Sequence, residues 1–278
     1  MEGGTARALT KTVTDSVVVL GTRLEVAWAG DKSDGPTLVF LHEGLGSVSM
    51  WRDFPERVAQ ETGRRALVYS RRGYGRSEVA PVPRALTYMH EEARTVLPAL
   101  LKELEVRDAV IVGHSDGGSI ALIYAGSVLD ASSCRVHGLV LMAPHVFCEE
   151  ISVASIREAR EAFVAGDLRS KLYRYHGQNT DCAFWGWNDA WLDPGFLKWN
   201  IEGFLPNVRV PVLAIQGADD RYGTLAQIDA IERGVSGRFQ RLVVEGCGHD
   251  PTRDAPAATR AAIKGFLAGL PGPVPIGP

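Results

Sequence analysis

The chain has 278 residues, a length within reach of one α/β domain that carries an insertion. Its hydrophobic fraction of 45% is ordinary for a globular protein and too high for a disordered one. The formal net charge is −3 and the basic residues are scattered, which excludes the electrostatic footprint of a nucleic-acid-binding protein.

The N-terminal segment and the cysteines bear on the compartment. Residues 1–16 lack the apolar core of a secretory signal, and no apolar run approaches the ~20 residues of a membrane span. The four cysteines are far apart and form no Cys-x-x-Cys pair: Cys134, Cys148, Cys182 and Cys247. We therefore expect free thiols in a reducing cytoplasm, and neither a membrane nor a nucleic acid as a partner.

Short β-branched runs alternate with amphipathic helical patterns along the chain. Residues 16–20 and 23–29 flank Gly21-Thr22 and predict an opening hairpin. The later strands are expected at residues 37–42, 66–70, 108–115, 138–144, 210–217 and 239–246. Because strands alternate with helices, the sequence predicts a mostly parallel, eight-stranded sheet with helices on both faces.

Three helices are clear from periodicity. Thr87 is expected to cap the first, whose apolar residues recur at helical spacing as far as Leu104. Residues 117–129 predict a helix directly after the strand at 108–115, and residues 255–270 predict the last one. The Pro/Gly-rich residues 271–278 predict a flexible tail.

The strand–helix alternation stops between residues 146 and 205, where the pattern is helical and rich in aromatic side chains. We interpret this segment as a cap over one edge of the sheet, with residues 1–145 and 206–270 forming the core. Some of its aromatic residues, with Trp185 and Trp187 as candidates, are expected to face the crevice and bind an apolar or aromatic group. The alternative is that they only pack the cap onto the core.

Ser115 lies in the run "DAVIVGHSDGG", where a predicted strand turns into a helix. Such a turn brings the strand and helix backbones very close, and Gly113 and Gly117 remove the side chains that would clash. The strained turn exposes the serine oxygen in the crevice beyond the strand ends, and the Asp116 amide can point at the same place. The sequence therefore predicts a nucleophilic serine with one oxyanion donor beside it.

A serine hydroxyl needs a base, and the base needs an orienting acid. His249 directly follows the last predicted strand, and Asp219 and Asp220 follow the strand before it. Because the carboxyl ends of parallel strands share one edge of the sheet, these groups should meet there. The chain order of serine, aspartate and histidine predicts a catalytic triad and leaves open which aspartate serves.

With these motifs the sequence resembles the α/β-hydrolase family over nearly its whole length. The motifs are "HEGLGS", "YSRRGYGRS", "GHSDGG", "GADD" and "GCGHD". The family's Gly-x-x-Asp pattern implies that Asp220 is the acid, and its first loop implies that the Gly44 amide is the second oxyanion donor. No cofactor or metal is expected, because phosphate-binding glycine loops and metal-ligand spacings are absent from the sequence.

Glu43 departs from the resemblance, since the family has glycine there. We expect its side chain to brace the loop by pairing with Arg71 or Arg72. The alternative is a polar group that lines the pocket and selects substrate or water. His145, just past a predicted strand end, is a further candidate for the pocket wall.

The sequence thus predicts a cofactor-independent serine hydrolase that acts through an acyl-enzyme on a small apolar or aromatic ester, thioester or lactone. One alternative is hydrolysis of a carbon–carbon bond in a ring-cleavage product, and another is a relative that binds a ligand without turnover. The expected partner is a small-molecule substrate, and whether the chain forms a homodimer is left open.

Overall fold

In the computed structural model the described residues are 13–127 and 134–270, so the expected flexible tail lies outside them. They contain one eight-stranded sheet in the order β1-β2-β4-β3-β5-β6-β7-β8. The strands are β1 (Val13–Val19), β2 (Thr22–Ala29), β3 (Thr37–Leu41), β4 (Ala66–Tyr69), β5 (Asp108–His114), β6 (Arg135–Met142), β7 (Val212–Gly217) and β8 (Phe239–Val244). From β4 to β8 all neighbours are parallel, and β2 runs antiparallel to both β1 and β4, so the predicted mostly parallel sheet is confirmed.

The opening hairpin turns one residue earlier than the sequence pattern indicates. Val19 pairs with Thr22, so Leu20 and Gly21 form the two-residue turn. Both have positive φ, 51° and 77°, as the mirror-image turns of tight hairpins require.

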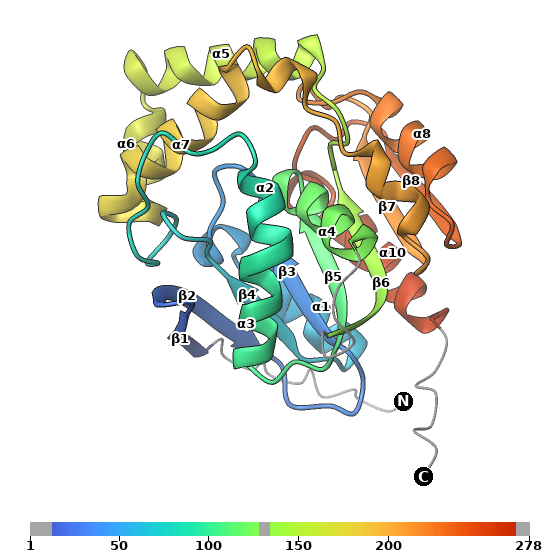
Figure 1. The fold of residues 1–278 in the computed structure, drawn as a ribbon. Coiled ribbons are helices and arrows are strands. Elements are labelled where there is room, and N and C mark those ends of the chain that lie inside the picture. Colours follow the sequence, from blue (N-terminus) through green and yellow to red (C-terminus); the bar gives the residue numbers. More distant parts are fainter. Residues whose placement is uncertain (1–12, 128–133, 271–278) are drawn as a thin grey trace, which may run out of the picture.

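Period-two alternation buries both faces of the central strands. In β5, Ala109 and Ile111 pack into one hydrophobic cluster, while Val110 and Val112 pack into the other. Helices α3, α4 and α8 contribute to the first cluster, and α1 and α10 contribute to the second, so the sheet is covered on both sides (Figure 1). These helices are α1 (Phe54–Thr62), α3 (Leu97–Glu103), α4 (Asp116–Gly126), α8 (Leu225–Gly234) and α10 (Pro256–Ala268).

The helix predicted after Thr87 is interrupted. A short helix α2 (Tyr88–Glu91) passes through a π-helical turn, η2 (Glu92–Val96), into α3. Pro98 has no amide hydrogen, so a regular ladder of hydrogen bonds cannot run through it. Thr87 occupies the N-cap position of α2, as expected, but its hydroxyl donates to the Glu91 side chain and accepts no backbone amide, so the expected side-chain cap is not formed.

Between β6 and β7 lie three helices, α5 (Glu150–Val164), α6 (Leu168–His176) and α7 (Thr180–Leu192), which we call the cap. The short 3-10 turns η4 (Phe196–Lys198) and η5 (Glu202–Asn207) lead back to the sheet. Figure 1 shows the cap as a separate layer over one end of the sheet. The segment is helical, as its pattern predicts.

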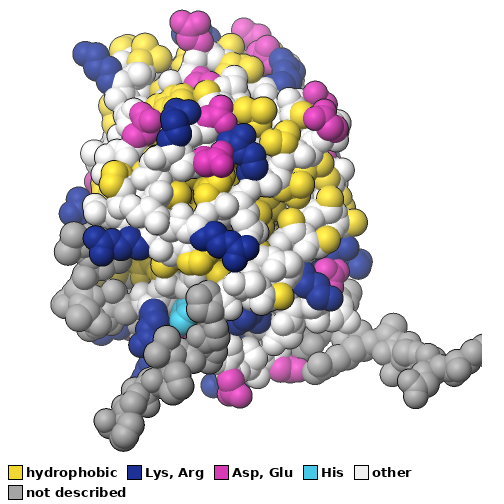
Figure 2. Space-filling view, turned by 90° about the vertical axis from the view of Figure 1, so that its right-hand side faces the viewer, with side chains coloured by type: hydrophobic (Ala, Val, Ile, Leu, Met, Phe, Trp, Pro, Cys, Tyr) yellow, Lys and Arg dark blue, Asp and Glu magenta, His cyan; other side chains and the backbone are white. Residues whose placement is uncertain are grey.

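The surface carries charges of both signs. On the face drawn in Figure 2, lysine and arginine side chains lie interspersed with aspartate and glutamate and are not gathered by sign. No helix in residues 13–127 or 134–270 is long and apolar enough to cross a membrane.

The glycines of the strand–helix turn provide a test of close packing. A Cβ at Gly117 would lie 2.0 Å from the Leu41 carbonyl oxygen, whereas a Cβ at Gly265, in α10, would meet nothing within 4 Å. We expect Gly117→Ala to lower the free energy of unfolding by ~3 kcal/mol, because the backbones must separate. Gly265→Ala should raise it by up to ~1 kcal/mol, since an open helical site favours alanine. Urea denaturation followed by circular dichroism measures both, and equal stabilities would contradict the packing argument.

Candidate active site

Ser115 occupies the strained turn between β5 and α4. Its backbone has φ 52° and ψ −116°, a conformation that non-glycine residues rarely adopt. Its amide donates to the Met142 carbonyl at 2.9 Å, and its carbonyl accepts from Gly118 at 2.8 Å. A Cβ at Gly113 would lie 2.3 Å from the Gly117 carbonyl oxygen, which is the close approach that the glycine spacing predicts.

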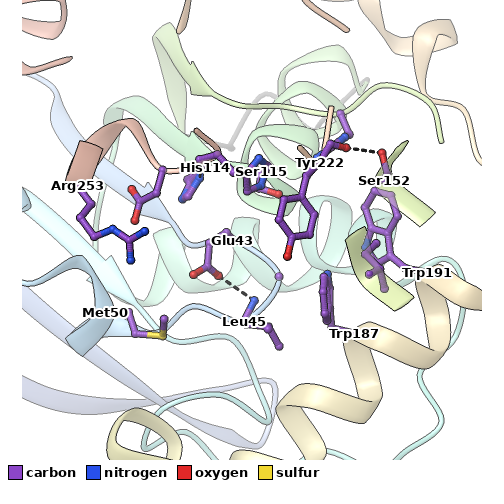
Figure 3. A pocket seen from close by; sticks show the side chains of 15 residues that line it. Glu43, Leu45, Met50, His114, Ser115, Ser152, Trp187, Trp191, Tyr222 and Arg253 are labelled. Atoms are coloured by element: carbon purple, nitrogen blue, oxygen red, sulfur yellow. Dashed lines mark hydrogen bonds between the residues drawn. The ribbon is translucent and has the colours of Figure 1, made fainter. Parts of the chain in front are cut away.

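Ser115 faces a cavity of about 210 Å³ between the core and the cap (Figure 3). The cavity is lined by Glu43, Gly44, Leu45, Met50, His114, Ser115, His145, Ser152, Ile156, Trp187, Trp191, Tyr222, His249, Asp250 and Arg253. The segments that follow five strands, β3, β5, β6, β7 and β8, therefore line the same small space together with two cap helices, α5 and α7.

His249 and Asp220 form a close pair at the edge of this cavity. His249 Nδ1 lies 2.8 Å from Asp220 Oδ2 and 3.0 Å from Oδ1. The carboxylate also accepts from Gln216 Nε2 and from the Tyr222 amide, each at 2.7 Å. Burial works to raise the pKa of Asp220, but the hydrogen bond and charge of His249 outweigh it and hold the pKa below its ordinary value. An ionised Asp220 fixes the proton on Nδ1 and leaves Nε2 free to accept another.

Asp219 points elsewhere. It is exposed, and its amide donates to the Cys247 carbonyl. The structure thus pairs His249 with Asp220, the aspartate that the family resemblance implies. Within the described residues no hydrogen bond joins the Ser115 hydroxyl to His249, although both line the cavity. Catalytic hydrogen bonds are often long in empty sites and tighten when substrate binds.

Two backbone amides are candidates for the oxyanion hole: that of Gly44, which lines the cavity, and that of Asp116, which directly follows Ser115 and is fully buried. Asp116 is the first residue of α4, and Gly44 lies in the loop after β3. Neither amide donates to an acceptor within the described chain. A Cβ at Gly44 would lie 2.2 Å from Trp187 Nε1, so the cap indole packs directly against this residue. A larger residue at position 44 would require the Trp187 side chain to move.

Glu43 lies in the cavity wall and forms no ion pair with an arginine of residues 13–127 or 134–270. Its Oε2 accepts from the Leu45 amide at 2.8 Å (Figure 3). Arg72 pairs with Glu78, and Arg71 donates to the backbone carbonyl of Glu43, so the expected brace through the side chain is wrong. The Arg71 guanidinium binds the Glu43 peptide oxygen, and the Glu43 carboxylate remains in the cavity wall.

The Glu43 carboxyl group is unusually hard to ionise. Burial, reinforced by the nearby charge of Asp250, raises its pKa to about 7, against the opposing charge of Arg71. At neutral pH the group therefore exchanges between an acid that can donate a hydrogen bond and a carboxylate that can only accept one.

His145 lines the cavity, as predicted. Burial and the proximity of His249 lower its pKa to about 3, so the ring is neutral. The ring centroid lies 5.7 Å from that of His249 and 5.3 Å from that of Trp191. Its Nδ1 is buried and has no hydrogen-bond partner among the described residues. No group of three or more metal-ligating side chains in residues 13–127 and 134–270 could hold a metal ion.

Of the two candidate tryptophans, only one faces the cavity. Trp187 lines it, but Trp185 packs on Phe163 and Phe184, so that candidate is wrong. Residues two apart in a helix point to nearly opposite sides, whereas residues four apart share a face. The spacing of Trp187 and Trp191 was the signal that would have selected the correct pair.

Tyr222 was missed by the sequence analysis. Its ring lies 4.7 Å from that of His249, and its carbonyl accepts from the Ser152 hydroxyl of the cap (Figure 3). Its position two residues after Asp220, in the same strand-end loop, would have indicated it.

A serine at a strained strand-to-helix turn, facing a cavity shared with a histidine–aspartate pair, defines a hydrolase of the α/β class. The chain belongs to the alpha/beta hydrolase family, whose model matches residues 38–262. A hydrolase role follows from this membership.

The relatives are diverse in reaction. The chain is 24% identical to the proline iminopeptidase of Lactobacillus helveticus over 254 residues, covering 79% of this chain and 85% of the relative. In fold it is similar to a serine hydrolase involved in carbazole degradation, with a TM-score of 0.72, 18% identity and coverage of 93% and 99% of the two chains. It is also similar to an enol-lactonase from Burkholderia xenovorans LB400, with a TM-score of 0.67, 18% identity and coverage of 91% and 100%.

The raised pKa of Glu43 makes stability depend on pH. Between about pH 4.5 and pH 7 the unfolded chain loses this proton while the folded chain keeps it, so rising pH should lower the free energy of unfolding. Glu43→Gln removes this dependence. Between pH 4 and pH 8 the free energy of unfolding of the wild type should fall by about 3 kcal/mol relative to that of the variant. Urea denaturation of both proteins across this range tests it, and a difference that does not change with pH would contradict the assigned burial.

Proposed function

We propose that the protein is a cofactor-independent serine hydrolase that cleaves a small ester, thioester or lactone through an acyl-enzyme. The observation that carries this proposal is that Ser115 and His249 line the same small cavity, while Asp220 accepts a hydrogen bond from His249 Nδ1. The four cysteines, none of them in a disulfide, support a reducing cytoplasm as its location.

In the proposed reaction Ser115 Oγ attacks the substrate carbonyl while His249 Nε2 takes its proton. The Gly44 and Asp116 amides stabilise the negative charge that develops on the carbonyl oxygen. The intermediate collapses, His249 protonates the leaving oxygen or sulfur, and the acyl group remains on Ser115. Water then attacks with His249 as base, which releases the acid and restores the serine.

The cavity supports a small substrate with an apolar or aromatic part. Met50, Ile156, Trp187 and Trp191 supply apolar wall, and a volume of about 210 Å³ accommodates only a small group beside the serine. Polar groups converge at the reacting end of the cavity, as is usual for sites that orient a mostly apolar ligand.

A second candidate is an aminopeptidase that cleaves an amide bond after an N-terminal residue. Its support is the similarity to proline iminopeptidase and the Glu43 carboxylate in the cavity, which could accept a hydrogen bond from a substrate amine. Turnover of p-nitrophenyl butyrate and of proline p-nitroanilide separates the two candidates. A ring-cleavage product in the same screen covers carbon–carbon bond hydrolysis.

Ser115→Ala should leave the fold intact and abolish turnover, because alanine needs no new space at the turn. The loss in kcat should reach ~10⁶-fold, as for other serine nucleophiles. Steady-state kinetics on the best substrate of the screen, with circular dichroism as the folding control, measures it. Activity retained within about tenfold would exclude Ser115 as the nucleophile.

Asp220→Asn should reduce kcat by roughly 10⁴-fold, since an amide cannot hold His249 in the required tautomer. Asp219→Asn is the matched control, because Asp219 is exposed and adjacent, and it should change kcat by less than about threefold. The reverse ranking would move the orienting role to Asp219.

A further inference from the structure

One buried guanidinium connects the two loops that carry the proposed oxyanion donors. Arg71, in the loop after β4, is 4% exposed. Its Nη2 lies 2.9 Å from the Glu43 carbonyl oxygen and 3.6 Å from Asp116 Oδ2. We propose that Arg71 is a positioning residue that sets the oxyanion hole by holding the Glu43–Gly44 peptide and the first residue of α4 in place. This inference rests on the proposed serine-hydrolase function.

The Glu43 carbonyl oxygen is held by three donors. It accepts from Arg71 Nη2, from His42 Nδ1 at 2.7 Å and from the Gly46 amide at 3.1 Å. In a trans peptide the C=O and N–H groups point in opposite directions. Fixing the Glu43 oxygen therefore turns the Gly44 N–H to the opposite side of the loop.

The Arg71 backbone also determines which ring nitrogen of His42 carries the proton. The Arg71 backbone amide donates to His42 Nε2 at 3.1 Å, so that nitrogen is an acceptor and the ring proton lies on Nδ1. Burial, together with the charge of Arg71, holds the pKa of His42 well below its ordinary value, so the ring stays neutral. Residue 71 thus acts on the Glu43 carbonyl twice, directly through the guanidinium and indirectly through its backbone amide, and only the first contact depends on the arginine side chain.

Arg71 also faces the side-chain carboxylate of Asp116, whose backbone amide is the other proposed oxyanion donor. Asp116 is fully buried and accepts from the Tyr88 hydroxyl at 2.6 Å. The same hydroxyl accepts from Trp191 Nε1 at 3.1 Å, and Trp191 lines the catalytic cavity. A buried carboxylate needs a charged or hydrogen-bonding partner, and the Arg71 guanidinium is the nearest cation that the structure records.

Losing the contacts that fix the Glu43–Gly44 peptide would change the electrostatics of the oxyanion hole as well as its geometry. If the Glu43–Gly44 peptide rotated by half a turn, its carbonyl oxygen would replace the Gly44 N–H beside the reacting carbonyl. A donor would then be exchanged for an acceptor where negative charge develops. Losing one oxyanion donor typically costs 10²–10³-fold in kcat.

The experiment compares three variants with the wild type. Arg71→Met combined with Asp116→Asn removes both charges of the buried pair and keeps an acceptor for Tyr88, so neither member of the pair is left as a lone charge. Arg71→Lys keeps the charge on a shorter side chain, which reaches less far than the terminal Nη2 that makes both contacts in the wild type. Arg72→Met is the control in the same loop, since Arg72 is exposed and pairs only with Glu78 among the ion pairs.

Two readouts separate positioning from general damage. The first is kcat and KM for the preferred ester, and the second is the affinity for a trifluoromethyl ketone analogue, whose adduct with serine places an oxyanion in the hole. The double variant should lose about 100-fold in kcat with KM changed by less than about threefold, and ketone affinity should fall by a similar factor. Arg71→Lys should lose about tenfold in both, and Arg72→Met should match the wild type.

Wild-type kcat in the folded double variant or in Arg71→Lys would overturn the inference, because a charge pair needed only for stability would then be replaceable. A fall in kcat without a fall in ketone affinity would overturn it as well. Failure of the proposed function is distinguishable, since it would show in the wild type as no labelling of Ser115 by a fluorophosphonate. If the double variant does not fold, the two readouts on Arg71→Lys decide.

Discussion

The close approach of three backbones at the end of β5 is the constraint on which the site depends. The turn at Ser115 can exist only if α4 starts directly against β5 and against the end of β3, and Gly113 and Gly117 permit both contacts. The same packing brings the start of α4 next to the loop that begins at His42. The positions of Ser115, the proposed nucleophile, and of the two proposed oxyanion amides therefore follow from one packing arrangement, which requires a strained backbone at Ser115.

Charge buried around this arrangement gives it a defined shape. Asp116 and Arg71 lie beneath the turn, where a lone charge would be expensive and a paired one fixes geometry. Glu43 is different, because its carboxyl group has no cationic side-chain partner among the described ion pairs and keeps its proton up to about pH 7. The loop after β3 thus uses its backbone for structure and presents its one acidic side chain to the pocket.

The cap completes the cavity from the opposite side. Trp187 packs on Gly44, and Ser152 donates to the Tyr222 carbonyl next to the histidine–aspartate pair. Cap and core therefore share contacts at the residues that flank the chemistry, so substitutions in α7 should alter the pocket without touching the nucleophile. Trp191 extends this link through Tyr88 to Asp116.

The sequence by itself determined the parallel sheet, the turn at Ser115 and the approximate positions of His249 and its aspartate, because these follow from local patterns and from the order of strand ends. Tertiary structure alone decided three further points. It directed Arg71 to the Glu43 carbonyl, in the loop after β3, because the chain fold brings this peptide oxygen within 2.9 Å of Nη2, while the Glu43 carboxylate accepts from the Leu45 amide. It turned Trp185 away from the cavity, because the phase of α7 is set by its packing on α5. It also placed Tyr222 beside His249, a contact between loops whose relative position depends on how β7 and β8 pair.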